Sequence, residues 1–178
     1  MIMKPRLRKF ALILHVTSSV GWVGAVAGFL ALAVTGMTSQ DVQVVRGAYL
    51  MMELTGRFVL VPLSLASLLT GLVQSLGTKW ALFRHYWVLF KLLINVFANV
   101  VLLMYTQTLG YLAGVAAQTN GDLSELRSPT AVIHACGALL LLLIATTLSV
   151  YKPRGMTRYG QRKQAEQVLR PQHALSQP

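Results

Sequence analysis

Charged residues are scarce in this chain, and acidic residues are scarcer still. Only 12% of its 178 residues are charged, five of them Asp or Glu, while 54% are hydrophobic. With a mean hydropathy of +0.57, this composition excludes an ordinary soluble domain and favours a membrane protein. The formal charge of +11 comes from short basic segments beside apolar runs, where such charges set topology and meet lipid headgroups. We therefore expect no nucleic-acid partner.

Cysteine and the common catalytic signatures are also lacking. Cys136 is the single cysteine, so an intramolecular disulfide is excluded and the redox compartment stays open. The chain has no phosphate-binding loop, no G-x-S-x-G and no H-E-x-x-H, and no two carboxylates are predicted at a common depth. The sequence therefore names no substrate, and it leaves open whether the protein is an enzyme.

Long apolar segments dominate what is present. About twenty apolar residues cross a bilayer of ~30 Å as a helix, and the first segment is too long for a signal-peptide core. The predicted spans are residues 10–36, 55–76, 83–109 and 131–151. Because the connections are short, we predict an all-α fold, a four-span antiparallel transmembrane helix bundle forming one domain over residues 1–151. The basic, polar tail of residues 152–178 is expected to be disordered or bound to headgroups.

The distribution of Lys and Arg predicts the orientation. Twelve of these residues fall on the side of the two termini, against Arg46, Arg57 and Arg127 on the other side. The positive-inside rule then places both termini in the cytoplasm, with anionic headgroups at the basic ends of the protein.

Local features of the first two spans have structural explanations. Gly24 and Gly28 form a G-x-x-x-G spacing that allows close helix packing. Pro62 is expected to kink the second span, because it lacks an N–H group. Glu53 and Arg57 are one helical turn apart and are expected to pair at the outer boundary.

The third span carries an unusual polar stripe. Lys91, Asn95 and Asn99 are spaced i, i+4, i+8 and so share one helix face. His15 in the first span lies at the same depth as Lys91, on the order of 9 Å from the basic boundary. We predict that Lys91 and His15 face the same interhelical space, where an ionisable group indicates a functional site. The alternative for Lys91 is snorkelling to the headgroups, and for His15 a structural hydrogen bond to a neighbouring helix.

Further polar and aromatic residues could complete a cavity around this pair. Trp22 is two turns from His15 on the same face, with Ser18 and Ser19 between them. Hydroxyl and amide groups of the second span could close the cavity, although such groups also serve as interhelical contacts. These are Ser64, Ser67, Thr70 and Gln74.

The other histidines are predicted to lie elsewhere. His85 is placed at the cytoplasmic boundary, and His134 begins the fourth span from the opposite side. His134 is therefore expected on the order of 20 Å from His15 along the membrane normal. This separation argues against one metal site built from all three histidines.

Two motifs carry a resemblance to known families. Residues 14–25, LHVTSSVGWVGA, and residues 85–92, HYWVLFKL, resemble a bacterial integral membrane family of unknown function. More distantly they resemble CopD-type copper-resistance membrane domains and HemJ-type protoporphyrinogen oxidases. The HemJ-type resemblance implies haem b between helices, with His15 as the axial metal ligand and Lys91 nearby. The CopD-type resemblance implies copper handling, for which Met37, Met51 and Met52 are candidates.

Three functional hypotheses follow. In the first, the bundle holds haem b or a related redox ligand in its cytoplasmic half, lined by Trp22 and Asn95, with Arg84 or Lys79 near the propionates. In the second, the polar stripe is a half-path for proton or metal-ion transport. In the third, the protein is a structural membrane subunit that binds a partner or a second copy of itself, as the glycine-rich first span suggests.

Overall fold

The computed structural model describes residues 3–77, 82–118, 123–153 and 155–175, and these form helices without any strand. The predicted all-α fold is confirmed. In chain order the elements are α1 (Pro5–Thr38), α2 (Val42–Thr55), the π-helix η1 (Gly56–Leu60), α3 (Val61–Gly77), α4 (Tyr86–Ala117), the 3-10 helix η2 (Glu125–Arg127), α5 (Thr130–Tyr151) and α6 (Arg158–Leu175).

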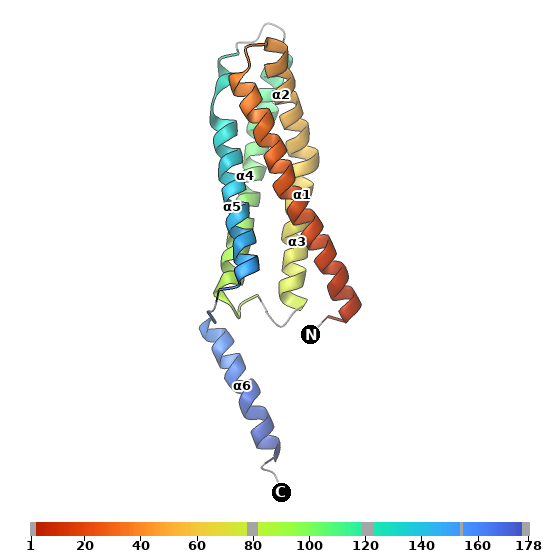
Figure 1. Ribbon diagram of the computed structural model, residues 1–178, viewed down its shortest axis with the longest axis vertical. Helices are drawn as coiled ribbons and strands as arrows, with labels where there is room; N and C mark the ends of the chain where they lie inside the picture. Colours follow the sequence, from red (N-terminus) through yellow and green to blue (C-terminus); the bar gives the residue numbers. More distant parts are fainter. Residues whose placement is uncertain (1–2, 78–81, 119–122, 154, 176–178) are drawn as a thin grey trace.

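Four helical segments of the described residues are long and apolar enough to cross a membrane. They are Pro5–Thr38, Val42–Gly77, Tyr86–Ala117 and Glu125–Tyr151. They run alternately up and down in one bundle (Figure 1), as a four-span antiparallel bundle requires. Large apolar side chains cover the outside of these segments. Phe58 and Met104 are both 68% exposed and Val150 is 70% exposed, which a lipid-facing surface explains and a water-facing one does not.

The second helical segment begins earlier than the sequence predicted. Residues 37–54 were expected to form a connection that includes helix on the approach to the second span, and this helix is α2, which starts at Val42 after the capping residue Asp41. The Asp41 carboxylate accepts hydrogen bonds from the backbone N–H groups of Gln43 at 2.8 Å and Val44 at 3.5 Å. An aspartate at this position satisfies donors that the first helical turn leaves unpaired.

A π-turn joins α2 to α3 where a proline kink was expected. The N–H of Val61 donates to the carbonyl of Gly56, five residues back, so the turn is one residue wider than an α-helical turn. Pro62 follows at once and has no N–H to donate. The widened turn thus accommodates the proline within a continuous helix. It also brings Gly56 close to α4, because a Cβ on Gly56 would lie 2.9 Å from Leu109 Cδ1.

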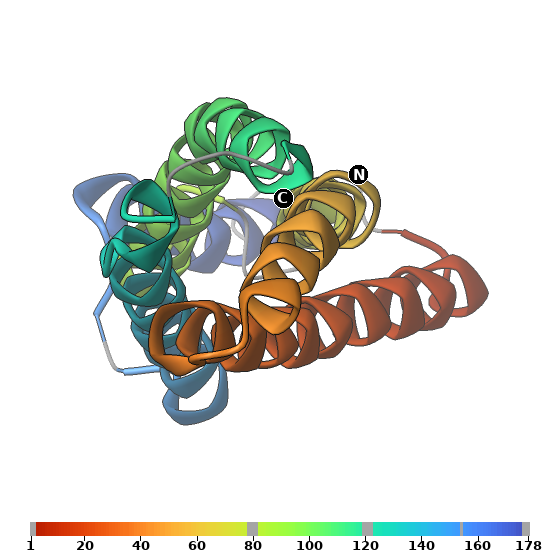
Figure 2. The same cartoon turned by 90° about the horizontal axis from the view of Figure 1, so that it is seen from above.

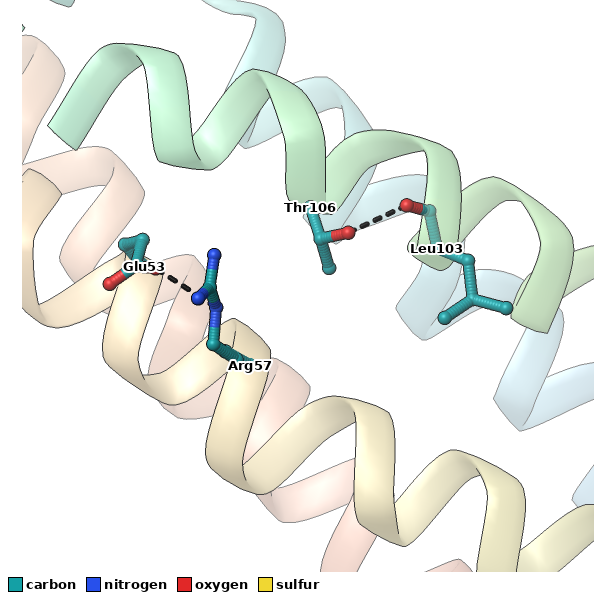
Figure 3. A network of polar contacts seen from close by, with 4 residues as sticks. All are labelled: Glu53, Arg57, Leu103 and Thr106. Carbon is teal, nitrogen blue, oxygen red and sulfur yellow. Dashed lines mark hydrogen bonds and ion pairs between the residues drawn. The ribbon is translucent and has the colours of Figure 1, made fainter. Parts of the chain in front are cut away.

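The Glu53–Arg57 ion pair predicted from the sequence is confirmed. Arg57 Nε lies 3.1 Å from Glu53 Oε1. Figure 3 shows Arg57 rising from η1 toward α4, where Thr106 donates to the carbonyl of Leu103. The pair bridges the junction of the two elements, with one partner in α2 and the other in η1.

The packing of the helices leaves α1 and α4 at opposite corners of the bundle. Helix α1 packs against α2, α3 and α5, and α4 packs against the same three helices. In the view from above (Figure 2), the α2–α3 segment lies on one side between α1 and α4, and α5 lies on the other. A side chain that joins α1 to α4 must therefore cross the interior.

The buried apolar core fills the half of the bundle near the α1–α2 turn. Its largest fully buried side chains are Trp22, Tyr49, Met52, Leu109 and Leu126. At this end the Tyr49 hydroxyl donates to the carbonyl of Leu126. Arg46 donates to the carbonyl of Ala116 at 2.9 Å in the last turn of α4. A cation there offsets the unpaired carbonyls of a helix C-terminus.

The tail, predicted to be disordered or bound to headgroups, contains the helix α6 over Arg158–Leu175. Thr157 starts this helix, since its hydroxyl accepts from the N–H of Gly160 at 3.1 Å. The Thr157 N–H also donates to the carbonyl of Arg84 at 3.0 Å, which ties the tail to the turn before α4. From there α6 extends away from the bundle (Figure 1).

Candidate functional site

His15 of α1 and Lys91 of α4 meet inside the bundle. Lys91 Nζ lies 3.3 Å from His15 Nε2, so the predicted proximity of these two residues is confirmed. Both side chains are partly buried. Because α1 and α4 lie at opposite corners, the contact crosses the bundle interior. Lys91 therefore lies inside the bundle and does not snorkel outward, which was the alternative.

Helix α3 fixes the orientation of the His15 ring. His15 Nδ1 is 3.1 Å from the carbonyl oxygen of Ser67 and 3.1 Å from the hydroxyl of Thr70. A carbonyl oxygen can only accept, so Nδ1 carries the proton. In the neutral ring Nε2 then holds a lone pair, which accepts from the amine of Lys91. The ring is thus a neutral imidazole held between a carbonyl and a cationic donor.

Gly71 makes room for this ring on α3. A Cβ added at Gly71 would lie 3.0 Å from His15 Cε1 and 3.4 Å from Nδ1. One turn earlier, Ser67 and Ser19 share a hydrogen bond of 2.7 Å between their hydroxyl groups. The face of α3 toward His15 is therefore polar and packs closely against the ring. It includes Gly71, which was not among the residues predicted from the sequence.

Two of the four predicted second-span residues contact His15, and two do not. Ser67 and Thr70 bind the ring directly. Ser64 donates instead to the carbonyl of Val61 in its own helix. Gln74 has a buried Nε2 for which the described residues offer no hydrogen-bond partner.

The asparagines extend the polar stripe toward the middle of the bundle. Asn95 is 7% exposed and Asn99 is 4% exposed. Each amide donates to the carbonyl four residues back, Asn95 to Lys91 at 2.8 Å and Asn99 to Asn95 at 2.9 Å. The buried Oδ1 of Asn99 has no hydrogen-bond partner among the described residues. Such an oxygen is costly unless water or a ligand satisfies it.

The remaining candidate residues lie apart from this pair. Trp22 is 2% exposed and belongs to the apolar core with Val26 and Phe29. Arg84 sits in the turn before α4, where its carbonyl accepts from Thr157. Lys79 lies outside the described residues. The structure thus brings together His15, Lys91 and Asn95 of the predicted site.

A second polar cluster, which the sequence did not reveal, lies between α4 and α5. The rings of Tyr105 and His134 stack with centroids 4.1 Å apart and planes 14° from parallel. His134 Nδ1 lies 2.8 Å from the carbonyl oxygen of Thr130. The sequence held a weak signal, a histidine at the start of a span, but the register between two antiparallel helices was needed to pair it with Tyr105.

The side chains around His15 offer few ligands for a metal or haem. Within the described parts of the chain, no three His, Cys, Asp or Glu side chains are grouped as around a metal ion. His15 has the tautomer of an axial ligand, with Nδ1–H bound to a carbonyl and a lone pair on Nε2. That lone pair, however, already faces Lys91. The arrangement described here therefore does not fit haem iron on His15 unless Lys91 moves away.

Comparison with known proteins gives no relative from which to transfer a function. No family model, no curated protein and no solved structure matches the chain. The resemblance to CopD-type and HemJ-type domains stays a prediction, and the functional proposal rests on geometry.

Proposed function

We propose that this chain is a multi-pass protein of a bacterial inner membrane in which the His15–Lys91 pair binds and releases a proton inside the helix bundle. The observation that carries the proposal is the 3.3 Å contact between Lys91 Nζ and His15 Nε2 across the interior. Ionisable groups inside membrane spans are costly and mark ion or proton paths.

The chemistry of the pair suits proton exchange. An ammonium group is a donor with three N–H bonds, and a neutral imidazole nitrogen is an acceptor. A proton given up by Lys91 can pass to His15 Nε2 without movement of either helix. Asn95 and Asn99 continue from Lys91 along the buried face of α4, so their amides can order water along the same path. The stripe then forms a half-path that starts at the end of the bundle nearest the termini.

The orientation and lipid contacts belong to the same proposal. The basic residues near both termini support a cytoplasmic location for these ends by the positive-inside rule. The basic tail, including Arg158 and Arg162 in α6, is suited to anionic headgroups. The path would then open toward the cytoplasm.

Proton flux into vesicles tests the proposal. The purified chain is reconstituted in liposomes with an internal pH-sensitive dye, and a potassium gradient with valinomycin supplies the driving force. We expect flux above that of empty liposomes, and at least a tenfold loss in Lys91→Leu and in His15→Ala. Lys9→Leu is the matched control, because Lys9 is an exposed lysine of α1. Equal flux in Lys91→Leu and Lys9→Leu would contradict the proposal. The same vesicles loaded with a copper indicator test the metal-ion alternative.

Haem b at His15 is the second candidate, and it requires that Lys91 move away from Nε2. It is favoured by the Nδ1–H bond to the Ser67 carbonyl, which leaves the ligand lone pair on Nε2. The test is an absorption spectrum of protein purified after expression with ample haem. Haem at this position predicts a Soret band that His15→Ala removes. A missing band, or one that persists in His15→Ala, rules the candidate out. If flux and spectrum are both unaffected while His15→Ala disturbs assembly, the pair has a structural role.

A further inference from the structure

The half of the bundle away from the His15–Lys91 pair contains two adjoining cavities, one lined by α2, α4, α5 and the η2 segment and the other lying between α4 and α5. Their volumes are about 320 and 330 Å³, within the range of small-molecule sites. Thr108 and Thr130 line both cavities, so the two cavities adjoin at these residues. Tyr105 is on the order of 21 Å from Lys91 along α4, so these cavities are separate from the proposed proton site.

His134 presents a hydrogen-bond acceptor to the second cavity. Its Nδ1 lies 2.8 Å from the Thr130 carbonyl oxygen, so Nδ1 carries the proton of the neutral ring. Nε2 then has a free lone pair, and the described residues supply no donor to it. A ligand that satisfies Nε2 must carry an O–H or N–H group.

The lining of the second cavity restricts the ligand further. Tyr105 and His134 stack nearly parallel and both line the second cavity, so part of its lining is aromatic. Aromatic side chains favour offset-stacked or edge-to-face contact with an aromatic ligand ring. The Thr108 and Thr130 hydroxyl groups, which can donate and accept, border the same space.

The cavity opens on the apolar outside of the bundle. Met104 lines it and is 68% exposed, on a surface that carries large apolar side chains. A ligand therefore enters from the lipid phase and can leave an alkyl tail there.

We propose that this cavity binds a lipid-soluble hydroxylated aromatic ring, of the quinol class. One ring hydroxyl donates to the in-plane lone pair of His134 Nε2, the ligand ring contacts the aromatic part of the lining, and its second oxygen lies near Thr108 and Thr130. The proposal concerns binding alone. It does not depend on proton exchange at His15 and Lys91.

Calorimetric titration of the detergent-purified full chain tests this site. The probe is a decyl-substituted benzoquinol kept reduced under anaerobic conditions, and the comparison ligand is its dimethyl ether, which has the same ring but no O–H. We expect the quinol to bind at least tenfold more tightly than the ether. His134→Phe keeps a flat ring and should bind both ligands alike, at the affinity of the ether. Cys136→Ser, an exposed position of the same helix, should bind as the unmodified chain does.

Two results would overturn the proposal. One is equal affinity of the unmodified chain for the quinol and the ether, which needs no variant and is therefore independent of folding. The other is a folded His134→Phe that keeps the preference for the quinol. Lys91→Leu is expected to bind the quinol as the unmodified chain does. A negative result in the proton-flux experiment would therefore leave the quinol-binding proposal unaffected.

Discussion

Replacing Gly71 with alanine should disturb His15 without removing any polar group. The new Cβ would lie 3.0 Å from His15 Cε1 and 3.4 Å from Nδ1, closer than the usual separation of 3.5–4.0 Å between carbon atoms. The ring must then move by roughly 0.5 Å to restore that separation. It cannot do so freely, because Nδ1 and Nε2 are both engaged with neighbouring helices.

The loss of stability in Gly71→Ala follows from the hydrogen bonds of His15 that the displaced ring would weaken. Weakening one net hydrogen bond costs about 1 kcal/mol. Alanine is also a better helix former than glycine by about 1 kcal/mol in soluble helices, which acts in the opposite direction. Gly24→Ala on α1 is the matched control, because its Cβ would meet nothing within 4 Å. We expect Gly71→Ala to be less stable than Gly24→Ala by about 1 kcal/mol, which isolates the contact from helix propensity.

Two assays test the predicted loss of stability and the predicted displacement of the His15 ring. Unfolding in mixed micelles with increasing dodecyl sulfate gives the difference in unfolding free energy between the variants. Nitrogen NMR of histidine-labelled protein should show the His15 resonances shifted in Gly71→Ala and unchanged in Gly24→Ala. If both variants are equally stable and the His15 resonances keep their positions, the close packing of α3 on this ring is wrong.

Two further predictions concern the helix ends. Asp41→Ala should lower the unfolding free energy by about 1 kcal/mol, because two N–H groups at the start of α2 lose their acceptor; Asp41→Asn, which keeps an acceptor oxygen, should recover most of it in the same micelle titration. Thr157→Val should loosen α6, because the side chain no longer accepts from Gly160 or donates to the turn before α4. Limited trypsin digestion should release the tail of Thr157→Val faster than the tail of Thr157→Ser, which keeps the hydroxyl group. Equal rates would contradict the anchoring role of Thr157.

The sequence was sufficient to predict what depends on periodicity and depth. The i, i+4, i+8 spacing placed Lys91, Asn95 and Asn99 on one face, and counting residues from the basic boundary placed His15 at the level of Lys91. Both inferences use only the rise and period of a helix, and the 3.3 Å contact confirms the pairing.

What the sequence could not supply depends on contacts between helices. The stacking of Tyr105 on His134 requires the vertical register of α4 against α5, which the lengths of the intervening segments do not fix. Gly71 looked like any small residue of a span until the His15 ring was seen against it. From its composition the tail was predicted to be disordered or bound to headgroups, whereas the hydrogen bond from Thr157 to Arg84 depends on a partner far away in the sequence.

The π-turn at Gly56–Leu60 acts as a rotational spacer between the two ends of the molecule. It holds one residue more than an α-helical turn, and each residue of an α-helix advances the direction of its side chain by about 100°. Removing that residue would turn α3 by about this angle relative to α2. Ser67 and Thr70, which bind the His15 ring, would then point away from α1, while α2 stayed in place. A single extra residue in the middle of a helix thus determines whether α3 directs its polar groups toward His15 at one end of the bundle.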